Sequence, residues 1–150
     1  MTPGMISRRV VVDRLKTVDD LLQDIRSLPL SDRKAFFADR RNAWTAESCL
    51  RRSLEAIFDV GRHILAKGFG VGVSEYKEIA VRLSEKRILS EDDAALMGIL
   101  AGYRNRMVHF YHEVSFDELY KICAEDLGDV ERIGNSLRDW IKDHPERVEN

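Results

Sequence analysis

Cysteine is scarce in this sequence, with only Cys49 and Cys123 among 150 residues. Both lie in segments of helical periodicity, and neither has a companion at the spacing of metal ligands. Two such thiols exclude a scaffold held by several disulfides and a zinc module built on cysteine pairs. We therefore expect two reduced, packed thiols in a cytoplasmic protein. We predict no cofactor.

Long apolar runs and strand-like alternation are missing as well. No segment approaches the roughly 18 apolar residues of a membrane span, and the first residues lack the apolar core of a signal peptide. No useful length of chain alternates with the two-residue period of a β-strand, and there is no internal repeat. These absences predict an all-α protein with no membrane association.

The composition that is present suits one helical domain. With 44% hydrophobic and 33% charged residues, a chain of this length can bury a single core. We expect one domain over residues 1–150, with flexible ends at 1–9 and 143–150. The net charge of −2 argues against wholesale wrapping of nucleic acid, but basic residues exceed acidic ones over residues 1–52 and permit a local basic patch.

Apolar residues recur at helical spacing along most of the chain, which predicts a bundle of about five helices. Clear stripes are formed by Val11, Leu15, Val18, Leu22 and Ile25, and by Leu50, Leu54, Ile57, Gly61 and Ile64. Pro29 ends the first helix, and Ser31 and Asp32 can cap a long second helix over about 32–66. The glycine-rich segment "KGFGVGVS" matches neither the Walker nor the dinucleotide fingerprint, so we interpret it as a helix stop and loop.

Helix starts are also visible in the second half. Ser74 and Ser90 are expected to cap two further helices. Ser115 and Glu118 form the pattern of a capping box, and Val114 and Leu119 are placed as its hydrophobic staple. A last helix then extends to about Trp140. The capping box requires the preceding helix to end by about residue 111 or 112.

The joint before this capping box carries the candidate chemistry, in the segment "GYRNRMVHFYHEVSF" at residues 102–116. A helix would stack Asn105, His109 and His112 on one face and place Arg104 and Tyr111 on another. Arginine and histidine together suffice to cleave RNA through its own 2′-hydroxyl. A histidine, with an ordinary pKa near 6.5, can accept or donate the proton, while guanidinium stabilises charge on the phosphoryl oxygens.

At these residues the sequence resembles the HepT ribonuclease toxins of the HEPN superfamily. The segment "RNRMVHFY" fits their motif of Arg, four residues, His, one residue and Tyr. The segments "LEAIFDVGRHILAKGFG", "SEYKEIAVRLSEKRILS" and "VSFDELYKI" resemble the family pattern as well, and the resemblance covers most of residues 10–142.

The resemblance implies a role for each motif residue. Arg104 and His109 would be the catalytic pair of a metal-independent endoribonuclease, with Asn105 as the supporting polar neighbour. It implies a homodimer with the motifs in a cleft between subunits, and a small nucleotidyltransferase antitoxin, MntA, as partner. That antitoxin would transfer AMP from ATP to Tyr111, and the added negative charge and bulk would block RNA entry.

A second hypothesis stays open, in which the same basic helix end merely binds a nucleotide or substrate and the protein is a non-catalytic partner subunit of a nucleotidyltransferase. Outside the motif, His112 is interpreted as a surface residue, His63 as a packed and satisfied one, and His144 as solvated. Arg106 is interpreted as solvent-facing, with a second phosphate contact as the alternative. Tyr103 and Tyr120 are expected in the core.

Overall fold

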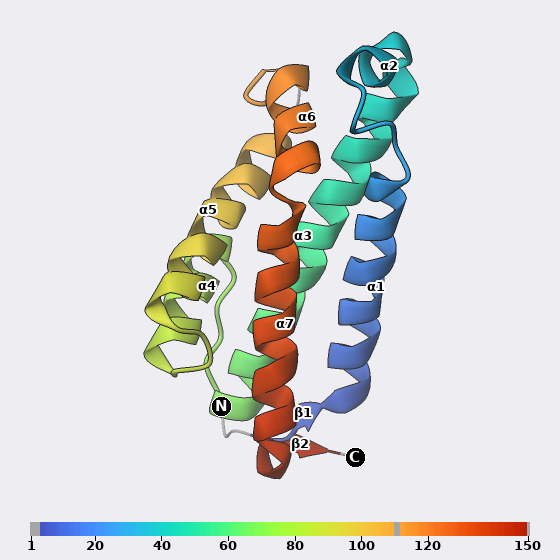
Figure 1. The fold of residues 1–150 in the computed structure, drawn as a ribbon. Coiled ribbons are helices and arrows are strands. Elements are labelled where there is room, and N and C mark those ends of the chain that lie inside the picture. Colours follow the sequence, from blue (N-terminus) through green and yellow to red (C-terminus); the bar gives the residue numbers. More distant parts are fainter. Residues whose placement is uncertain (1–3, 110–111, 150) are drawn as a thin grey trace.

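The computed structural model describes residues 4–109 and 112–149, which form a bundle of seven α-helices closed at one end by two short strands (Figure 1). In chain order the elements are β1 (Ile6–Ser7), α1 (Arg8–Arg26), α2 (Arg33–Ala38), α3 (Arg40–Phe69), α4 (Tyr76–Glu85), α5 (Glu91–Met107), α6 (Phe116–Glu125), α7 (Leu127–Asp143), a 3₁₀ turn (Pro145–Arg147) and β2 (Val148–Glu149). The all-α prediction is confirmed.

Several helices begin where a side-chain oxygen can accept a bond from a free backbone N–H of the first turn. Ser90 Oγ accepts from the N–H of Asp93 at 3.1 Å, and Ser115 Oγ accepts from the N–H of Glu118 at 3.1 Å, as predicted. The prediction of Ser74 as a cap is wrong by one residue. Helix α4 begins after Glu75, whose side chain makes no capping bond.

Two of the five predicted helices are each divided in two. The expected helix over 32–66 is interrupted at Asp39, which is extended with φ −130° and ψ 112° and whose carboxylate accepts from the N–H of Arg41. The last predicted helix is interrupted at Asp126. Apolar residues continue at helical spacing across both breaks, so periodicity alone did not reveal a single non-helical residue.

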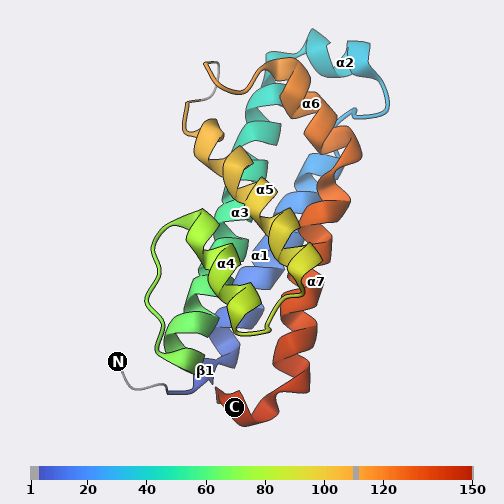
Figure 2. The ribbon, with the colours of Figure 1, turned by 90° about the vertical axis from the view of Figure 1, so that its left-hand side faces the viewer.

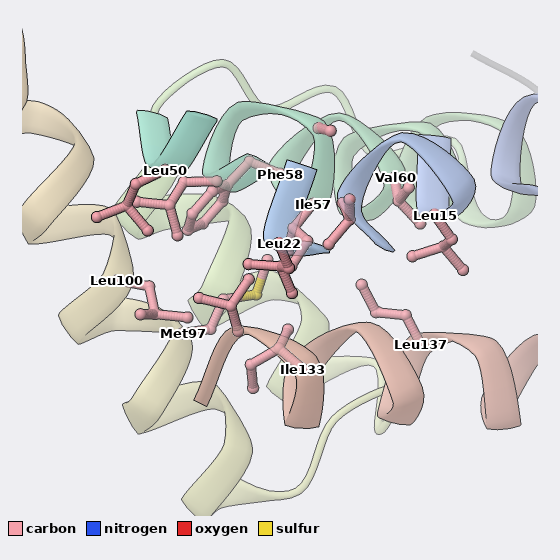
Figure 3. Close-up of a cluster of buried hydrophobic side chains, with 14 of the residues drawn as sticks. Leu15, Leu22, Leu50, Ile57, Phe58, Val60, Met97, Leu100, Ile133 and Leu137 are labelled. Carbon is pink, nitrogen blue, oxygen red and sulfur yellow. The ribbon is translucent and has the colours of Figure 1, made fainter. Parts of the chain in front are cut away.

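Helix α3 is the centre of the bundle and contacts every other α-helix. The close-up in Figure 3 shows how its apolar residues meet side chains from three other helices, α1, α5 and α7. The labelled residues are Leu15, Leu22, Leu50, Ile57, Phe58, Val60, Met97, Leu100, Ile133 and Leu137, all with less than 4% of their surface exposed. Both predicted stripes therefore face one shared core.

Two glycines, one within α3 and one directly after it, set the path of the chain towards α4. Gly61 packs directly against α4, because a Cβ there would lie 2.9 Å from Leu83 Cδ1 and 3.1 Å from Ile79 Cγ2. Gly70 ends α3 in the left-handed conformation at φ 67°, where glycine carries no steric penalty. The interpretation of "KGFGVGVS" as a helix stop and loop is thereby confirmed, and α4 lies beside α3 and α5 (Figure 2).

The two ends of the chain, for which we expected flexibility, contain paired strands. Ile6 is opposite Val148 and Ser7 is opposite Glu149 in a parallel ladder. Ile6 and Val148 are buried, and Ile6 fills the space above Gly68. Strands of two residues are too short to show alternation, so the sequence pattern did not predict them.

Cys49 and Cys123 are free and buried, as expected. Burial raises the pKa of both thiols, that of Cys123 to about 12, so neither is a reactive nucleophile at neutral pH. Across the described residues, none of the helices combines the length and the apolar character that crossing a bilayer requires.

Candidate functional site

A polar hollow of about 560 Å³ lies where α3, the start of α4 and the end of α5 meet. Its lining consists of Arg62, Ser74, Glu75, Tyr76, Lys77, Arg104 and Asn105. Three of these residues are cationic and one is acidic. The hollow therefore brings two members of the predicted site, Arg104 and Asn105, together with residues that sequence reasoning did not select.

Arg104 is held in place by contacts on two sides. Its Nη2 donates to Glu55 Oε2 at 2.9 Å and its Nε reaches the same oxygen at 3.3 Å. Its guanidinium carbon lies 4.5 Å from the centre of the Tyr76 ring, within the range of a cation–π contact. With 24% of its side chain exposed, Arg104 is oriented by protein atoms while still lining the hollow.

The groups that hold Arg104 are themselves supported. Glu55 Oε1 accepts from Arg51 Nη1 at 3.4 Å, and Arg51 Nε donates to Glu47 Oε1 at 2.9 Å along the same face of α3. The Tyr76 ring packs on buried Phe58, with centroids 4.9 Å apart. Arg104 is thus part of a network that crosses from α3 to α5 and does not depend on its own helix alone.

His109 lies in a different environment. Helix α5 ends at Met107, so His109 belongs to the turn that follows, where its N–H donates to the carbonyl of Arg106 at 3.0 Å. Its side chain is 64% exposed, and Nε2 lies 3.8 Å from Glu113 Oε2. The predicted helical stacking of Asn105, His109 and His112 is wrong, because the helix stops before the two histidines.

Arg106 links the last turn of α5 to the first turn of α6, on either side of the turn that carries His109. Its Nη1 and Nη2 bind the two carboxylate oxygens of Glu118 at 3.0 and 2.7 Å, and Nη1 also donates to the carbonyl of Glu113 at 3.2 Å. The pairing with Glu118 raises the pKa of Arg106. The interpretation of Arg106 as solvent-facing is therefore wrong, because its partner lies in the first turn of the next helix, 12 residues along the chain.

The structure thus unites part of the predicted site. Arg104 and Asn105 line one hollow, whereas His109 is not among its lining residues. His112 is exposed, as predicted, and donates its N–H to the carbonyl of His109 at 3.0 Å. Tyr111, the predicted modification site, lies outside the described residues.

The other two histidines are structural. His63 Nε2 accepts from the N–H of Ser7 at 2.9 Å, which confirms a packed and satisfied residue, and burial lowers its pKa. The prediction of a solvated His144 is wrong, because its ring stacks on Trp140 with centroids 4.4 Å apart and Nδ1 lies 2.8 Å from the Trp140 carbonyl.

The two tyrosines predicted in the core are both partly buried. Tyr120 packs against Phe36 and Phe37 and donates its hydroxyl to the carbonyl of Leu30. The guanidinium carbon of Arg106 lies 5.4 Å from the centre of the Tyr103 ring, and burial raises the pKa of Tyr103. Both rings pack against the core, so neither competes with Tyr111 as the predicted modification site.

Sequence reasoning missed Glu55, Arg62, Tyr76 and Lys77. Only one signal was available: Glu55 and Arg62 are seven residues apart, a spacing that places them on one face of a helix. Nothing in the sequence links that face to Arg104, 49 residues from Glu55. The described residues contain no group of three or more His, Cys, Asp or Glu side chains that could hold a metal ion.

Comparisons with known proteins agree with this fold. The HEPN toxin of Shewanella oneidensis, solved in tri-AMPylated form in complex with MNT antitoxin, superposes with a TM-score of 0.77 at 18% identity over 87% of this chain and 97% of that one. YutE of Bacillus subtilis, a cytosolic protein of unknown function, gives 0.78 at 16% identity over 97% and 98%. A toxin–antitoxin structure with AMP-PNP gives 0.75 at 17% identity over 85% and 97%.

These structural likenesses, at such low identity, establish the fold. No curated protein matches the sequence. The family is established by a different comparison, in which the family model described as ribonuclease HepT-like matches residues 18–137, most of the chain and the whole of the site. The predicted resemblance is thereby confirmed, and the chain belongs to the HepT-like ribonuclease family.

Proposed function

We propose that this protein is the toxin of a toxin–antitoxin pair and cleaves RNA through its 2′-hydroxyl, with Arg104 and His109 as the catalytic pair. The observation that supports this most is the anchoring of Arg104. Its guanidinium is fixed by Glu55 and Tyr76 in an open cationic hollow, at the end of the helix that leads to an exposed histidine. Membership of the HepT-like family agrees with this chemistry.

The reaction needs no group beyond these side chains and the RNA itself. One imidazole takes the proton of the 2′-hydroxyl, and the 2′-oxygen then forms a bond to the adjacent phosphorus. The bond from phosphorus to the 5′-oxygen breaks, and a protonated imidazole gives a proton to that leaving oxygen. Arg104, with Asn105 beside it, stabilises charge on the non-bridging oxygens. The products are a 2′,3′-cyclic phosphate and a 5′-hydroxyl.

In the proposed homodimer, the second subunit supplies the second imidazole. One face of α5 is suited to be the dimer interface. Ala95 and Ile99 are exposed on this face, and a Cβ added at Gly98 or Gly102 would meet nothing within 4 Å. Small residues let two helix backbones approach closely. Figure 2 shows α5 on the outer side of the bundle with α4 beside it. Contact through this face would bring the two turns that carry His109 towards one another.

Regulation by AMP transfer to Tyr111 is part of the proposal. A nucleotidyltransferase antitoxin would join the tyrosine oxygen to the α-phosphorus of ATP and release pyrophosphate. Tyr111 is two residues beyond His109, so the new phosphodiester would add negative charge next to the cationic site. The tri-AMPylated relative from Shewanella oneidensis is the parallel for this step.

The central test is cleavage by the purified protein in EDTA, with Tyr111 shown to be unmodified by mass spectrometry. We expect RNA fragments with 2′,3′-cyclic phosphate ends, and loss of cleavage in His109→Ala with an unchanged circular dichroism spectrum. His112→Ala is the matched control, because His112 is a second exposed histidine in the same joint. An inert wild-type protein with free Tyr111 would contradict the enzyme hypothesis.

One observation favours the alternative, a non-catalytic partner subunit that binds a nucleotide or substrate for a nucleotidyltransferase. The hollow contains Arg104 and Asn105 but not His109. Under this hypothesis, the unmodified protein leaves RNA intact, and Arg104→Ala weakens nucleotide binding while His109→Ala does not. The same preparation therefore separates the two functions.

A further inference from the structure

Two cations of the hollow, Arg62 and Lys77, have no part in the catalytic motif. Arg62 comes from α3 and Lys77 from the first turn of α4, and both line the hollow together with Arg104. We propose that Arg62 and Lys77 bind a phosphate of the RNA strand next to the one that is cleaved. This inference rests on the proposed function and adds the part of the substrate that the hollow recognises.

Arg62 has donors to spare for such a phosphate. Its Nη1 reaches Asp59 and its Nη2 reaches the carbonyl of Ser74, each at 3.4 Å, close to the limit for a hydrogen bond. Its Nε has no partner among the described residues although it is shielded from solvent. Because Nε is shielded, the contact with a phosphate would be made by Nη1 and Nη2. An arginine whose terminal nitrogens are held only by two such long bonds, beside an open hollow, is suited to an incoming anion.

The charge around the hollow also favours an anion. Lys77 is exposed and forms no ion pair within the described residues. Among the described lining residues, Glu75 is the one acid against three cations. Glu55 pairs with Arg104, and Asp59 lies 3.4 Å from Arg62 and 3.9 Å from Arg14. Lys77 therefore contributes an unpaired positive charge to the hollow, and Arg62 contributes one that is only loosely paired, on the wall formed by α3 and the start of α4.

Among the described lining residues of the hollow, Tyr76 carries the one aromatic ring, and the contacts of this ring favour recognition of the backbone of the strand over its bases. Tyr76 already packs on Phe58 and carries the Arg104 guanidinium, with the Arg62 guanidinium carbon 5.9 Å from the ring centre. It is not free to stack on a base. Contacts from guanidinium and ammonium groups to phosphate carry no sequence information, so binding here should be independent of sequence.

The direct test is binding of a 2′-O-methyl oligonucleotide, which cannot be cleaved, followed by fluorescence anisotropy at several salt concentrations. We expect Arg62→Gln and Lys77→Gln each to raise Kd about tenfold, since each removes one charged contact, and to lower the salt slope by about one. The matched controls are Arg82→Gln, whose arginine has similar exposure and two acidic partners, and Lys121→Gln on α6. Lys77 is exposed, so its variant leaves the fold intact.

Cleavage then locates the contact along the strand. A dinucleotide has a single phosphodiester and cannot reach a second phosphate site. Arg62→Gln should therefore raise KM for an oligonucleotide about tenfold more than it raises KM for the dinucleotide. The inference is overturned if both substrates suffer equally, if the variants bind no more weakly than their controls, or if they lose AMP binding but keep RNA binding.

The binding arm separates this inference from the proposed function. If the protein fails to cleave RNA but binds the 2′-O-methyl strand through Arg62 and Lys77, the catalytic hypothesis is wrong and the phosphate site stands. If it cleaves RNA and the two variants behave as wild type, the enzyme hypothesis stands and the phosphate site is wrong.

Discussion

The environments of Arg104 and His109 differ sharply, although the two residues are only five positions apart. Arg104 lies within a helix, 24% exposed, with a carboxylate at 2.9 Å and an aromatic ring against its face. His109 lies in a turn, 64% exposed, with its nearest carboxylate at 3.8 Å. The described contacts within one chain therefore orient Arg104, the anion-binding residue of the proposed site, more firmly than His109, its proposed proton-transfer residue.

Because of this difference, Arg104 and His109 depend on different contacts for their orientation. Orientation of Arg104 depends on contacts across the core of one chain, from α3 and α4. Within the described residues, the charged contact of the His109 ring is the one with Glu113 at 3.8 Å, so under the proposed function a second subunit or the RNA would complete its orientation.

Chemical rescue gives the largest contrast. Removal of either side chain, in His109→Ala or Arg104→Ala, should lower cleavage roughly 10³-fold. Because His109 is exposed, added imidazole should restore part of the activity of the first variant. Guanidinium, which can occupy the hollow beside Glu55, should restore part of the second. Rescue of both variants by imidazole would show that the two environments are not distinct.

A bulky side chain on the open face of α5 should remove the dimer without harming the fold. In Gly98→Leu the new Cβ meets no atom of its own chain within 4 Å, and leucine is a better helix former than glycine by about 0.5–1 kcal/mol. We expect a monomer of equal or slightly higher Tm, with cleavage reduced at least tenfold, as measured by analytical ultracentrifugation and an RNA assay. Gly128→Leu is the control, because Gly128 also has open space but lies on α7. A Gly98→Leu variant that is still dimeric and active would show that this face of α5 is not the dimer interface.

Loosening Arg104 without removing it should have a smaller effect. Glu55→Gln takes away the charge that orients the guanidinium, and kcat should fall roughly tenfold because small misplacements of a catalytic group are costly. Glu55→Asp should recover part of the loss. Glu47→Gln, whose carboxylate pairs with Arg51 alone, is the control and should retain wild-type kcat. Equal loss in both glutamine variants would indicate a general effect on α3.

The smallest effect concerns His63, a half-buried histidine that contrasts with exposed His109. Burial, with a further contribution from Lys67, lowers its pKa below the ordinary 6.5, and its Nε2 accepts the Ser7 N–H only when neutral. Its contribution to stability is therefore full above about pH 6.5 and is lost as pH falls through the lowered value. Tm measured by thermal unfolding should be lower at pH 5.5 than at pH 7.5. We expect His63→Gln to reduce this difference in Tm and His112→Gln to leave it as in the wild type.

Local signals predicted the helical parts of this fold well. The stripe from Val11 to Ile25 is buried, and Ser90 and Ser115 cap helices where expected, because periodicity and capping act over three or four neighbouring residues. Individual side-chain pairings were not predicted, whether between distant residues or between residues four positions apart. Arg106 meets Glu118 and His144 stacks on Trp140, although both arginine and histidine had been interpreted as facing solvent.

The residues of the candidate site also divide into those that local sequence signals predicted and those that they did not. Sequence reasoning predicted the helical class, the capping box at Ser115 and the motif with Arg104, Asn105, His109 and Tyr111, since each of these depends on residues that are close together in the chain. It did not predict that Glu55 pairs with Arg104 or that Arg62 and Lys77 line the same hollow, because these contacts depend on how the helices pack. The physical reason is that a helix presents many polar side chains to its surroundings, and the packing of α3 and α4 against α5 determines which of them share a hollow.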